Sequence, residues 1–240
     1  MKKILFLSLA TLLMAGCSKD DGAKLSLSTN SVSLYSEDTE KVTASEKVTW
    51  SSDDEFVATI DNDGTITGEH VGKTIITATS NNGEDKCAVE VKAKYNTYTE
   101  PIFEFGASKS TIKSKESRIL DTEKETSLLF KPEKSAIQGV GYLFKDGKMT
   151  SIGVNVKLSS AQEATKFLIE RYLVIGAGVE GFAGIMINNL PNKASMGITM
   201  SVESGYVLVM YIPYDKNKTR SIIEEDITKN EMKKIFESTK

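Results

Sequence analysis

The chain has 240 residues, with 30 Lys and Arg against 33 Asp and Glu, which gives a formal net charge of −3. This mildly acidic balance, without a basic stripe, excludes a nucleic-acid-binding protein because it would repel phosphate. With one histidine and two cysteines, the chain lacks the residues for a His-based zinc site or a two-histidine mechanism, and we expect no cofactor.

Residues 1–16 are typical of an export signal. Lys2 and Lys3 precede an apolar run, residues 4–13, that is too short to span a bilayer. The sequence Leu-Met-Ala-Gly-Cys at residues 13–17 resembles the lipobox of bacterial lipoproteins, which implies cleavage before Cys17 and acylation of that residue. Several acyl chains hold a protein firmly, because each buried methylene contributes about 0.8 kcal/mol. The alternative is a plain secretory signal that happens to precede a cysteine.

Residues 17–24 form a lipidated tether to the membrane. Within it, Ser18, Lys19, Asp20 and Asp21 resemble the acidic export signal that sends lipoproteins of Bacteroidetes to the outer face of the outer membrane. A flexible spacer of small and charged residues is the alternative interpretation. We expect a protein anchored in the outer membrane and facing the cell exterior.

Residues 25–93 are predicted to form an all-β immunoglobulin-like sandwich. Short alternating runs rich in Val, Ile and Thr are separated by turn residues at the spacing of such a fold. The dipeptides Asp63-Gly64 and Asn82-Gly83 fit tight hairpin turns. The predicted strands are residues 31–35, 40–44, 48–52, 57–61, 65–68, 73–80 and 87–92.

Several short motifs in this domain follow one another in a recognisable order. They are Trp-Ser-Ser at 50–52, Val-Ala-Thr-Ile at 57–60, Asp-Gly at 63–64, Ile-Thr-Gly at 66–68 and Gly-Lys-Thr-Ile-Ile-Thr-Ala at 72–78. The pattern resembles the bacterial immunoglobulin-like group 2 domain (BIG2), which implies a binding or spacer module of surface proteins. From the residues themselves, we expect Trp50 at the centre of the sandwich, and Gly68 and Gly72 at a bend.

Three features of this domain invite a chemical interpretation. Residues 61–64 begin like a calcium loop, but the remaining ligands are missing, so a hairpin turn is favoured. His70 lies in a polar turn and is interpreted as solvated. Cys87 alternates with Val89 and Val91, which indicates a buried, inert thiol.

Residues 98–215 are predicted to form a separate α+β domain. Ser108 is placed to cap a helix at 109–118, and Ser160 with Glu163 forms a capping box ahead of a second helix. The predicted strands are 127–131, 140–144 and 152–156 after the first helix, and 184–188, 195–202 and 206–213 after the second. Two helix-plus-three-strand repeats predict one antiparallel sheet with both helices on a single face.

This arrangement is similar to the repeat in periplasmic inhibitor and assembly proteins of the β-lactamase-inhibitor and SmpA/OmlA type. It also resembles the domain that follows BIG2 in other Bacteroidetes lipoproteins. Both resemblances rest on element order and a Phe-Gly-Ala-Ser opening at 105–108, and neither assigns a role to a residue of this chain.

The glycines at 176, 178 and 181 match the pattern G-x-G-x-x-G. A dinucleotide site needs a strand before these glycines and a helix after them, within a βαβ unit. Here the apolar run before Gly176 continues the predicted helix, so the segment is interpreted as a helix-to-strand loop.

No catalytic set assembles from the sequence. Carboxylate runs at 53–55 and 224–226 are typical of solvated faces. For a binding protein, the aromatic residues expected to be exposed are more informative, because their faces stack on sugars or on partner side chains; burial in the sheet is the alternative. These candidate ligand-binding residues are Tyr95, Tyr98, Tyr211 and Tyr214.

Residues 216–240 form a highly charged tail. Thr228 and Glu231 are placed to cap a short helix through Ile235 and Phe236 that docks on the second domain. A frayed end is the alternative.

These observations predict a non-catalytic surface lipoprotein that binds an extracellular glycan or protein. The alternative is an accessory, assembly or inhibitory subunit of an envelope complex, and an uncharacterised hydrolase is a more distant third. No sequence feature identifies the ligand or the oligomeric state.

The anchor leads to a first prediction. Replacing the lipidated thiol in Cys17→Ala should move most of the protein from the membrane to the medium or the soluble fraction, as measured by cell fractionation and immunoblotting. The Cys87→Ala variant, which keeps Cys17, is the matched control and should stay with the membrane. Retention of Cys17→Ala in the membrane would contradict the anchor.

Overall fold

The computed structural model describes residues 24–177, 184–214 and 226–237. The export signal, Cys17 and the four residues after it therefore lie outside the described residues, as does the second half of the glycine motif. Within the described ranges, none of the helices combines the length and apolar character needed to cross a bilayer.

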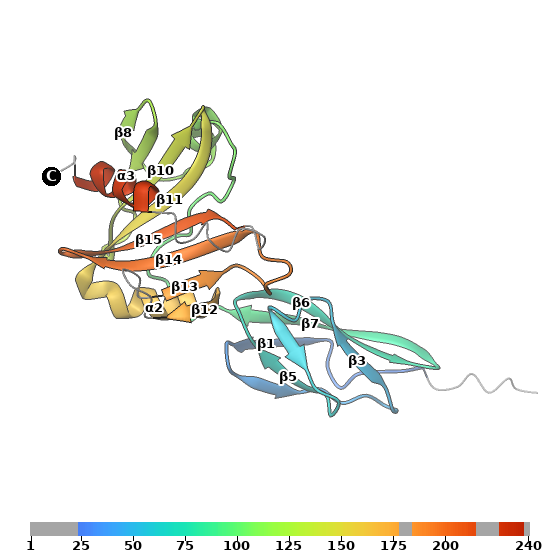
Figure 1. Ribbon diagram of the computed structural model, residues 1–240. Helices are drawn as coiled ribbons and strands as arrows, with labels where there is room; N and C mark the ends of the chain where they lie inside the picture. Colours follow the sequence, from blue (N-terminus) through green and yellow to red (C-terminus); the bar gives the residue numbers. More distant parts are fainter. Residues whose placement is uncertain (1–23, 178–183, 215–225, 238–240) are drawn as a thin grey trace, which may run out of the picture.

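The first domain is a sandwich of two small sheets (Figure 1). Its strands are β1 (Ser31–Tyr35), β2 (Thr39–Lys41), β3 (Thr49–Ser52), β4 (Ala58–Ile60), β5 (Thr65–Gly68), β6 (Gly72–Ser80) and β7 (Gly83–Lys92). One sheet has the order β1-β7-β6-β3 and the other β2-β5-β4. Strands β1 and β7 pair in parallel, whereas the other neighbours are antiparallel. Alternating Val and Ile side chains fill the space between the sheets because successive residues of a strand face opposite sides.

Two sequence interpretations in this domain are confirmed. Asp61 accepts hydrogen bonds from the backbone N–H groups of Asp63 (2.9 Å) and Thr65 (2.8 Å), and Gly64 has a φ of +81°, so residues 61–64 are a hairpin turn. These backbone donors hold the pKa of Asp61 below its usual value. Cys87 is fully buried among the core residues, and burial raises the pKa of its thiol.

Two other interpretations need correction, and a third is extended. Trp50 is only partly buried, because β3 is an edge strand and the indole packs against the margin of the core. His70 is not simply solvated: its ring stacks on Phe56 with centroids 4.1 Å apart, and Nδ1 lies 2.8 Å from the Phe56 carbonyl oxygen. Gly68 and Gly72 do flank the bend between β5 and β6, as predicted, and Gly68 also permits a close approach, since a Cβ there would lie 2.2 Å from the Leu34 side chain.

The second domain is built on one eight-stranded antiparallel sheet with the order β12-β13-β14-β15-β11-β10-β9-β8. Its elements are α1 (Lys109–Lys115), β8 (Leu120–Lys124), β9 (Ser127–Phe130), β10 (Ile137–Lys145), β11 (Lys148–Lys157), a 3-10 turn (Leu158–Ser160), α2 (Ala161–Ile169), β12 (Leu173–Ala177), β13 (Gly184–Ile187), β14 (Met196–Glu203), β15 (Tyr206–Pro213) and α3 (Asp226–Glu237). Two four-strand meanders meet where β15 pairs with β11.

Each of α1 and α2 is thus followed by four strands, not by the three that the sequence predicted. The additional strands, β8 and β12, are the two edges of the sheet. Strand β8 is mostly polar and exposed, and β12 occupies the apolar run that the sequence analysis assigned to the end of a helix. Of the two residues predicted to cap helix N-termini, Ser108 does cap α1, whereas Ser160 makes no side-chain capping bond to α2.

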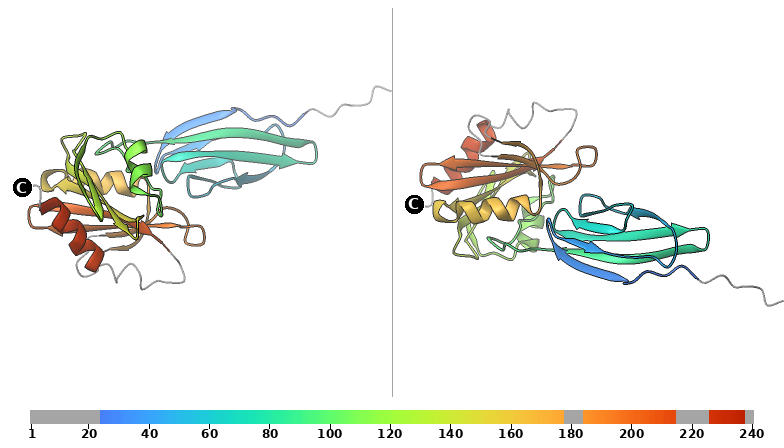
Figure 2. Two further views of the ribbon diagram at one scale, coloured as in Figure 1. Left: turned by 90° about the horizontal axis from the view of Figure 1, so that it is seen from above. Right: turned by 90° about the horizontal axis from the view of Figure 1, so that it is seen from below.

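Helices α1 and α2 cover one face of the sheet and α3 covers the other (Figure 2). Ile112 of α1 and Phe167 of α2 belong to the same buried cluster, together with the segment 98–107 that enters the domain. On the opposite face, Met232, Ile235 and Phe236 of α3 are buried against β9, β10 and β15. The helix begins at Asp226, so Thr228 lies within it and is not its cap.

Glycines on β10 and β11 form the trough in which α3 sits. A Cβ at Gly153 would lie 2.5 Å from Met232 Cγ, and one at Gly141 would lie 3.0 Å from its sulfur. Ion pairs from Lys229 (3.0 Å) and Lys233 (2.5 Å) to Glu203 fix the helix further. Although burial opposes it, these ammonium groups hold the pKa of the Glu203 carboxyl below its usual value.

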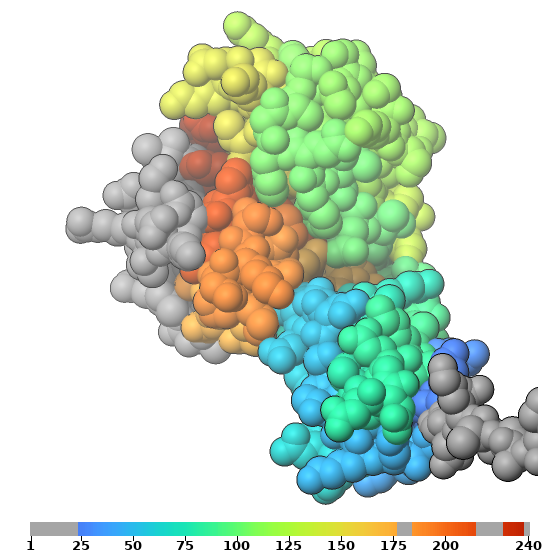
Figure 3. Space-filling view, turned by 90° about the vertical axis from the view of Figure 1, so that its right-hand side faces the viewer, coloured from blue at the N-terminus to red at the C-terminus, as the bar shows by residue number. Residues whose placement is uncertain are grey.

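The two domains meet at Glu170, immediately after α2. Its carboxylate accepts hydrogen bonds from the backbone N–H groups of Lys94 (2.9 Å) and Tyr95 (3.1 Å), and it also binds Arg171. Its carbonyl oxygen accepts a bond from the Val71 N–H of the first domain at 2.7 Å. We name this set of contacts the Glu170 clamp. Figure 3 shows the surfaces of the two domains in contact, and Leu173 and Leu190 of the second domain pack against the core of the first.

The clamp gives the second prediction. In Glu170→Ala, two backbone N–H groups and Arg171 lose a buried partner, which should cost about 2 to 4 kcal/mol. The junction should therefore open locally, and tryptic cleavage after Lys92 and Lys94 should become at least about tenfold faster. Glu163→Ala, on an exposed position of the same helix, is the control. Equal cleavage rates for both variants would show that the clamp does not hold the domains.

Candidate functional site

The four candidate tyrosines do not form one surface. Tyr98 and Tyr211 are 1% and 0% exposed, and their hydroxyl oxygens are hydrogen-bonded to each other at 2.6 Å in the core. The expectation that these two rings are exposed is therefore wrong. Burial raises the pKa of both hydroxyls well above the usual value, so they stay protonated. Their role is to fasten the incoming segment to the sheet.

Tyr95 and Tyr214 are partly exposed but lie in different parts of the second domain. Tyr95 packs at the margin of the main core, next to the Glu170 clamp. Tyr214 packs on Ile185 and Ile212 in a separate small cluster. Tyr95 lines a concave surface, a groove at the domain junction that is described further below.

The glycine motif lacks the structure of a dinucleotide site. Residues 173–177 form strand β12, so the apolar run is not a continuation of α2, which ends at Ile169. A strand does precede Gly176, but β12 pairs antiparallel with β13, the next strand in the described chain. A βαβ unit would require parallel strands, so the fingerprint is not met.

The buried carboxylates of this domain serve an ion-pair network. Arg118 donates to Glu116 at 2.9 Å and to Glu133 at 2.5 Å, and also to the Thr99 carbonyl oxygen. Although burial opposes it, the guanidinium holds the pKa of Glu133 below its usual value. Within the ranges that the structure describes, no three His, Cys, Asp or Glu side chains are grouped as metal ligands would be. The network fixes the entry segment in place.

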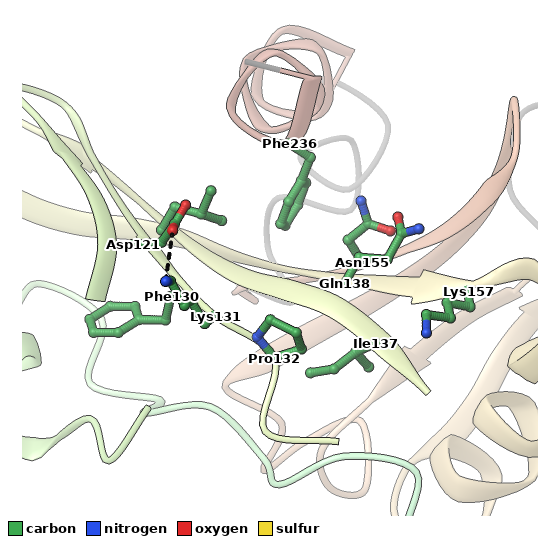
Figure 4. A pocket seen from close by; sticks show the side chains of 10 residues that line it. Asp121, Phe130, Lys131, Pro132, Ile137, Gln138, Asn155, Lys157 and Phe236 are labelled. Atoms are coloured by element: carbon green, nitrogen blue, oxygen red, sulfur yellow. Dashed lines mark ion pairs between the residues drawn. The ribbon is translucent and has the colours of Figure 1, made fainter. Parts of the chain in front are cut away.

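A pocket with a volume of about 450 Å³ lies on the α3 face of the sheet (Figure 4). We name it the sheet pocket. It lies where α3 ends and leaves the strands uncovered. Its lining residues are Asp121, Leu129, Phe130, Lys131, Pro132, Ile137, Gln138, Asn155, Lys157 and Phe236. The volume lies in the range of roughly 300–1,000 Å³ that is typical of small-ligand sites.

Two β-bulges build this pocket. The pairing of β8 with β9 shifts register between Leu120 and Thr122, and that of β10 with β11 shifts between Ile137 and Gly139. Asp121 and Gln138 are the extra residues at these shifts, and both line the pocket. A bulge bends its strand and redirects a side chain, which is why bulges are frequent beside binding sites.

Asn155 is the most informative residue of the pocket. It lies on β11 opposite Gly139 of β10 and Leu208 of β15, and it is 3% exposed. Its Oδ1 atom has no hydrogen-bond partner among the described residues. A buried acceptor without a partner costs stability, and this one lies in the wall of the pocket.

Other polar and charged side chains also line the sheet pocket. In Figure 4 the amides of Gln138 and Asn155 rise from the strands on the side from which the Phe236 ring descends. Lys131 lies 3.8 Å from the Asp121 carboxylate, and Lys157 stands at the opposite side of the pocket. The pocket therefore offers amide donors and acceptors, a carboxylate, ammonium groups and an aromatic ring to one small polar ligand.

Comparison with known proteins assigns the first domain. Residues 25–91 match the family model of the bacterial Ig-like domain (group 2). Domains of this family are often found in surface proteins and in adhesion-related modules. No curated protein matches the chain.

Sequence reasoning missed the residues of the sheet pocket. One signal was available: Asn155 interrupts an otherwise apolar arm, Ile-Gly-Val-Asn-Val at 152–156, of a strand that is buried on both faces. A polar residue in such a strand needs a partner. The contribution of Asp121 and Gln138 depends on the bulges, and that of Phe236 depends on the docking of α3.

The unpaired amide gives the third prediction. Because Asn155 Oδ1 has no protein partner, Asn155→Leu should raise the free energy of unfolding by about 1 kcal/mol in urea titrations. Asn188→Leu is the control, since that amide donates to Ser195 Oγ and accepts from the N–H groups of Ser195 and Met196. It should lose about 1 to 3 kcal/mol. A loss of stability in Asn155→Leu as large as in the control would mean that Asn155 is a structural residue.

Proposed function

We propose that this protein is a non-catalytic, lipid-anchored surface protein that binds a saccharide in the sheet pocket. One observation carries the proposal: Asn155, a deeply buried amide whose Oδ1 atom has no hydrogen-bond partner among the described residues, lines a pocket beside two β-bulges of the sheet. Proteins keep residues that lower the free energy of unfolding in this way chiefly where function requires them.

The lining favours a saccharide over other small ligands. A sugar carries many hydroxyl groups, each of which both donates and accepts, so it can satisfy the amides of Asn155 and Gln138 and the carboxylate of Asp121 together. Its apolar C–H face fits against the Phe236 ring, beside the apolar side chains of Pro132 and Ile137. Lys157 adds a charge suited to an acidic or phosphorylated sugar.

The placement at the cell surface is supported by the order of the segments. The lipobox-like sequence at residues 13–17 precedes a domain of a family that is often found in surface proteins. The binding domain follows, and the Glu170 clamp holds it against the first domain. In this arrangement the Ig-like domain separates the binding domain from the outer membrane.

A second candidate function rests on the edge strand β12. Val174 and Ile175 are 41% and 45% exposed there, and an edge strand with exposed apolar side chains is a surface on which another chain can add a strand. This observation favours an accessory or inhibitory subunit of an envelope complex.

The fourth prediction separates these functions. On a glycan array the protein should bind a subset of saccharides, and both Asn155→Leu and Gln138→Ala should weaken that binding by at least about tenfold, or 1.4 kcal/mol. Gln162→Ala removes an exposed amide on α2 and is the matched control. Saccharide binding that survives in both pocket variants would contradict the proposal. Recovery of one envelope protein, with no saccharide bound, would favour the accessory role.

A further inference from the structure

A second concave site lies where the two domains meet. It is a groove of about 190 Å³, which we name the junction groove. The first domain contributes the end of β1 and the turn after it, and the second contributes α2. The lining residues are Tyr35, Ser36, Glu37, Lys94, Tyr95, Lys166, Ile169 and Glu170. Neither domain alone has both walls.

The walls of the groove are held in place by partly buried hydrogen bonds. On one side, the Glu170 clamp fixes the backbone of Lys94 and Tyr95. On the other side, Ser36 donates to the Glu69 carbonyl oxygen at 2.7 Å and the Glu37 N–H donates to that of Gly68 at 2.7 Å. The groove is therefore formed before any ligand arrives, which lowers the entropic cost of binding.

Glu37 carries backbone strain. Its φ is +71°, a left-handed conformation that a non-glycine residue adopts at a cost. The only other described non-glycine residue with a positive φ is Asp146, in the tight turn between β10 and β11, where such angles are required. Residues 35–38 form a β-turn that the Asp38 N–H closes on the Tyr35 carbonyl oxygen at 3.2 Å, and Glu37 occupies its third position, where a type II turn requires a positive φ. This turn places Ser36 and Glu37 in the groove.

Three ammonium groups gather over the aromatic rings of the groove. Lys92 Nζ and Lys94 Nζ lie 4.9 and 5.5 Å from the centroid of the Tyr35 ring. Lys166 Nζ lies 5.7 Å from the centroid of the Tyr95 ring. Cation–π contacts of this kind hold each charge at a defined position. Within the described part of the chain, none of the three lysines forms an ion pair with a carboxylate.

The nearby acidic groups do not neutralise these lysines. The Glu170 carboxylate is already bound to two backbone N–H groups and to Arg171. Glu37 is exposed, as the three lysines are, and its single charge offsets only one of theirs. The groove thus presents unpaired positive charge on a protein whose formal net charge is negative.

We propose that the junction groove binds an acidic polysaccharide through one of its carboxylate or sulfate groups. The groove is too small for a whole drug-sized ligand, but it can admit a single charged substituent of a polymer. An anion placed among the three ammonium groups relieves their mutual repulsion and forms charge-assisted hydrogen bonds. This site is separate from the sheet pocket, so the inference goes beyond the proposed function and does not depend on it.

The fifth prediction tests the groove with three polymers: polygalacturonate for carboxylate, dextran sulfate for sulfate and unmodified dextran as the neutral reference. Titration calorimetry with the full chain should detect binding to at least one of the polyanions and none to dextran. The binding should weaken when salt rises from about 50 mM to about 200 mM, because it is electrostatic. The polyanion that binds identifies the charged group. Equal binding to dextran, or no binding to either polyanion, overturns the proposal.

Variants locate the binding within the molecule. The pair Lys94→Gln and Lys166→Gln should together lower the polyanion affinity at least about tenfold, whereas Lys145→Gln, an exposed lysine at the end of β10, should leave it nearly unchanged. An equal loss in the control variant would mean nonspecific charge binding and would overturn the proposal. Asn155→Leu should leave polyanion binding intact, so failure of the sheet-pocket function and failure of this one are distinguishable.

Glu170→Ala provides a test in which charge and structure predict opposite results. Removing a carboxylate from a cationic groove should strengthen polyanion binding if charge alone matters. If the groove requires the clamp, binding should weaken about tenfold despite the added positive charge. Near-UV circular dichroism checks that each domain remains folded. Stronger binding by a folded Glu170→Ala variant would overturn the composite groove.

Discussion

The carboxylate of Glu170 is the constraint on which the arrangement of the two domains depends. It accepts hydrogen bonds from two backbone N–H groups of the connecting segment, and this restricts the conformations that the segment can adopt. The backbone carbonyl oxygen of Glu170 accepts a third hydrogen bond, from an N–H group of the first domain. The two bonds to the carboxylate are strengthened by its charge. A connection that resembles a linker in the sequence is therefore a fixed joint, and Tyr98, a few residues beyond it, is already part of the core of the second domain.

Within the second domain, one face of the sheet both packs against α3 and forms the floor of the sheet pocket. Because the glycines on β10 and β11 have no side chains, α3 can pack close to the strands. Met232 fills the space above these glycines. Beyond the last described residue of α3, the same face changes from apolar to polar within a few residues. Gly153 lies under Met232, whereas the Oδ1 atom of Asn155, next on that face of β11, has no hydrogen-bond partner among the described residues. The sheet pocket thus begins where the contacts of the helix end.

The sequence allowed a good account of local structure and a poorer account of how distant segments meet. The turn at Asp61–Gly64 could be predicted because its own side chain and glycine determine it. The edge strands β8 and β12 could not, because one is too polar and the other too apolar to show the alternation of a half-buried strand. Tyr98 and Tyr211 are 113 residues apart, and only folding reveals that their hydroxyls satisfy each other. The same limit applies to both sites, since Asp121, Asn155 and Phe236 come together only through strand pairing and helix docking.

The parallel pairing of β1 with β7 has a mechanical consequence. Lys92 ends β7 at the joint, and the register places Tyr35 beside it, so β1 begins at the end of the first domain remote from the second. Tension applied between residue 24 and the second domain would then pull these neighbouring strands past each other along their length. Five paired positions, from Ser31 with Ala88 to Tyr35 with Lys92, would share the load at once instead of separating one after another. Such a geometry suits a module that must withstand flow or traction.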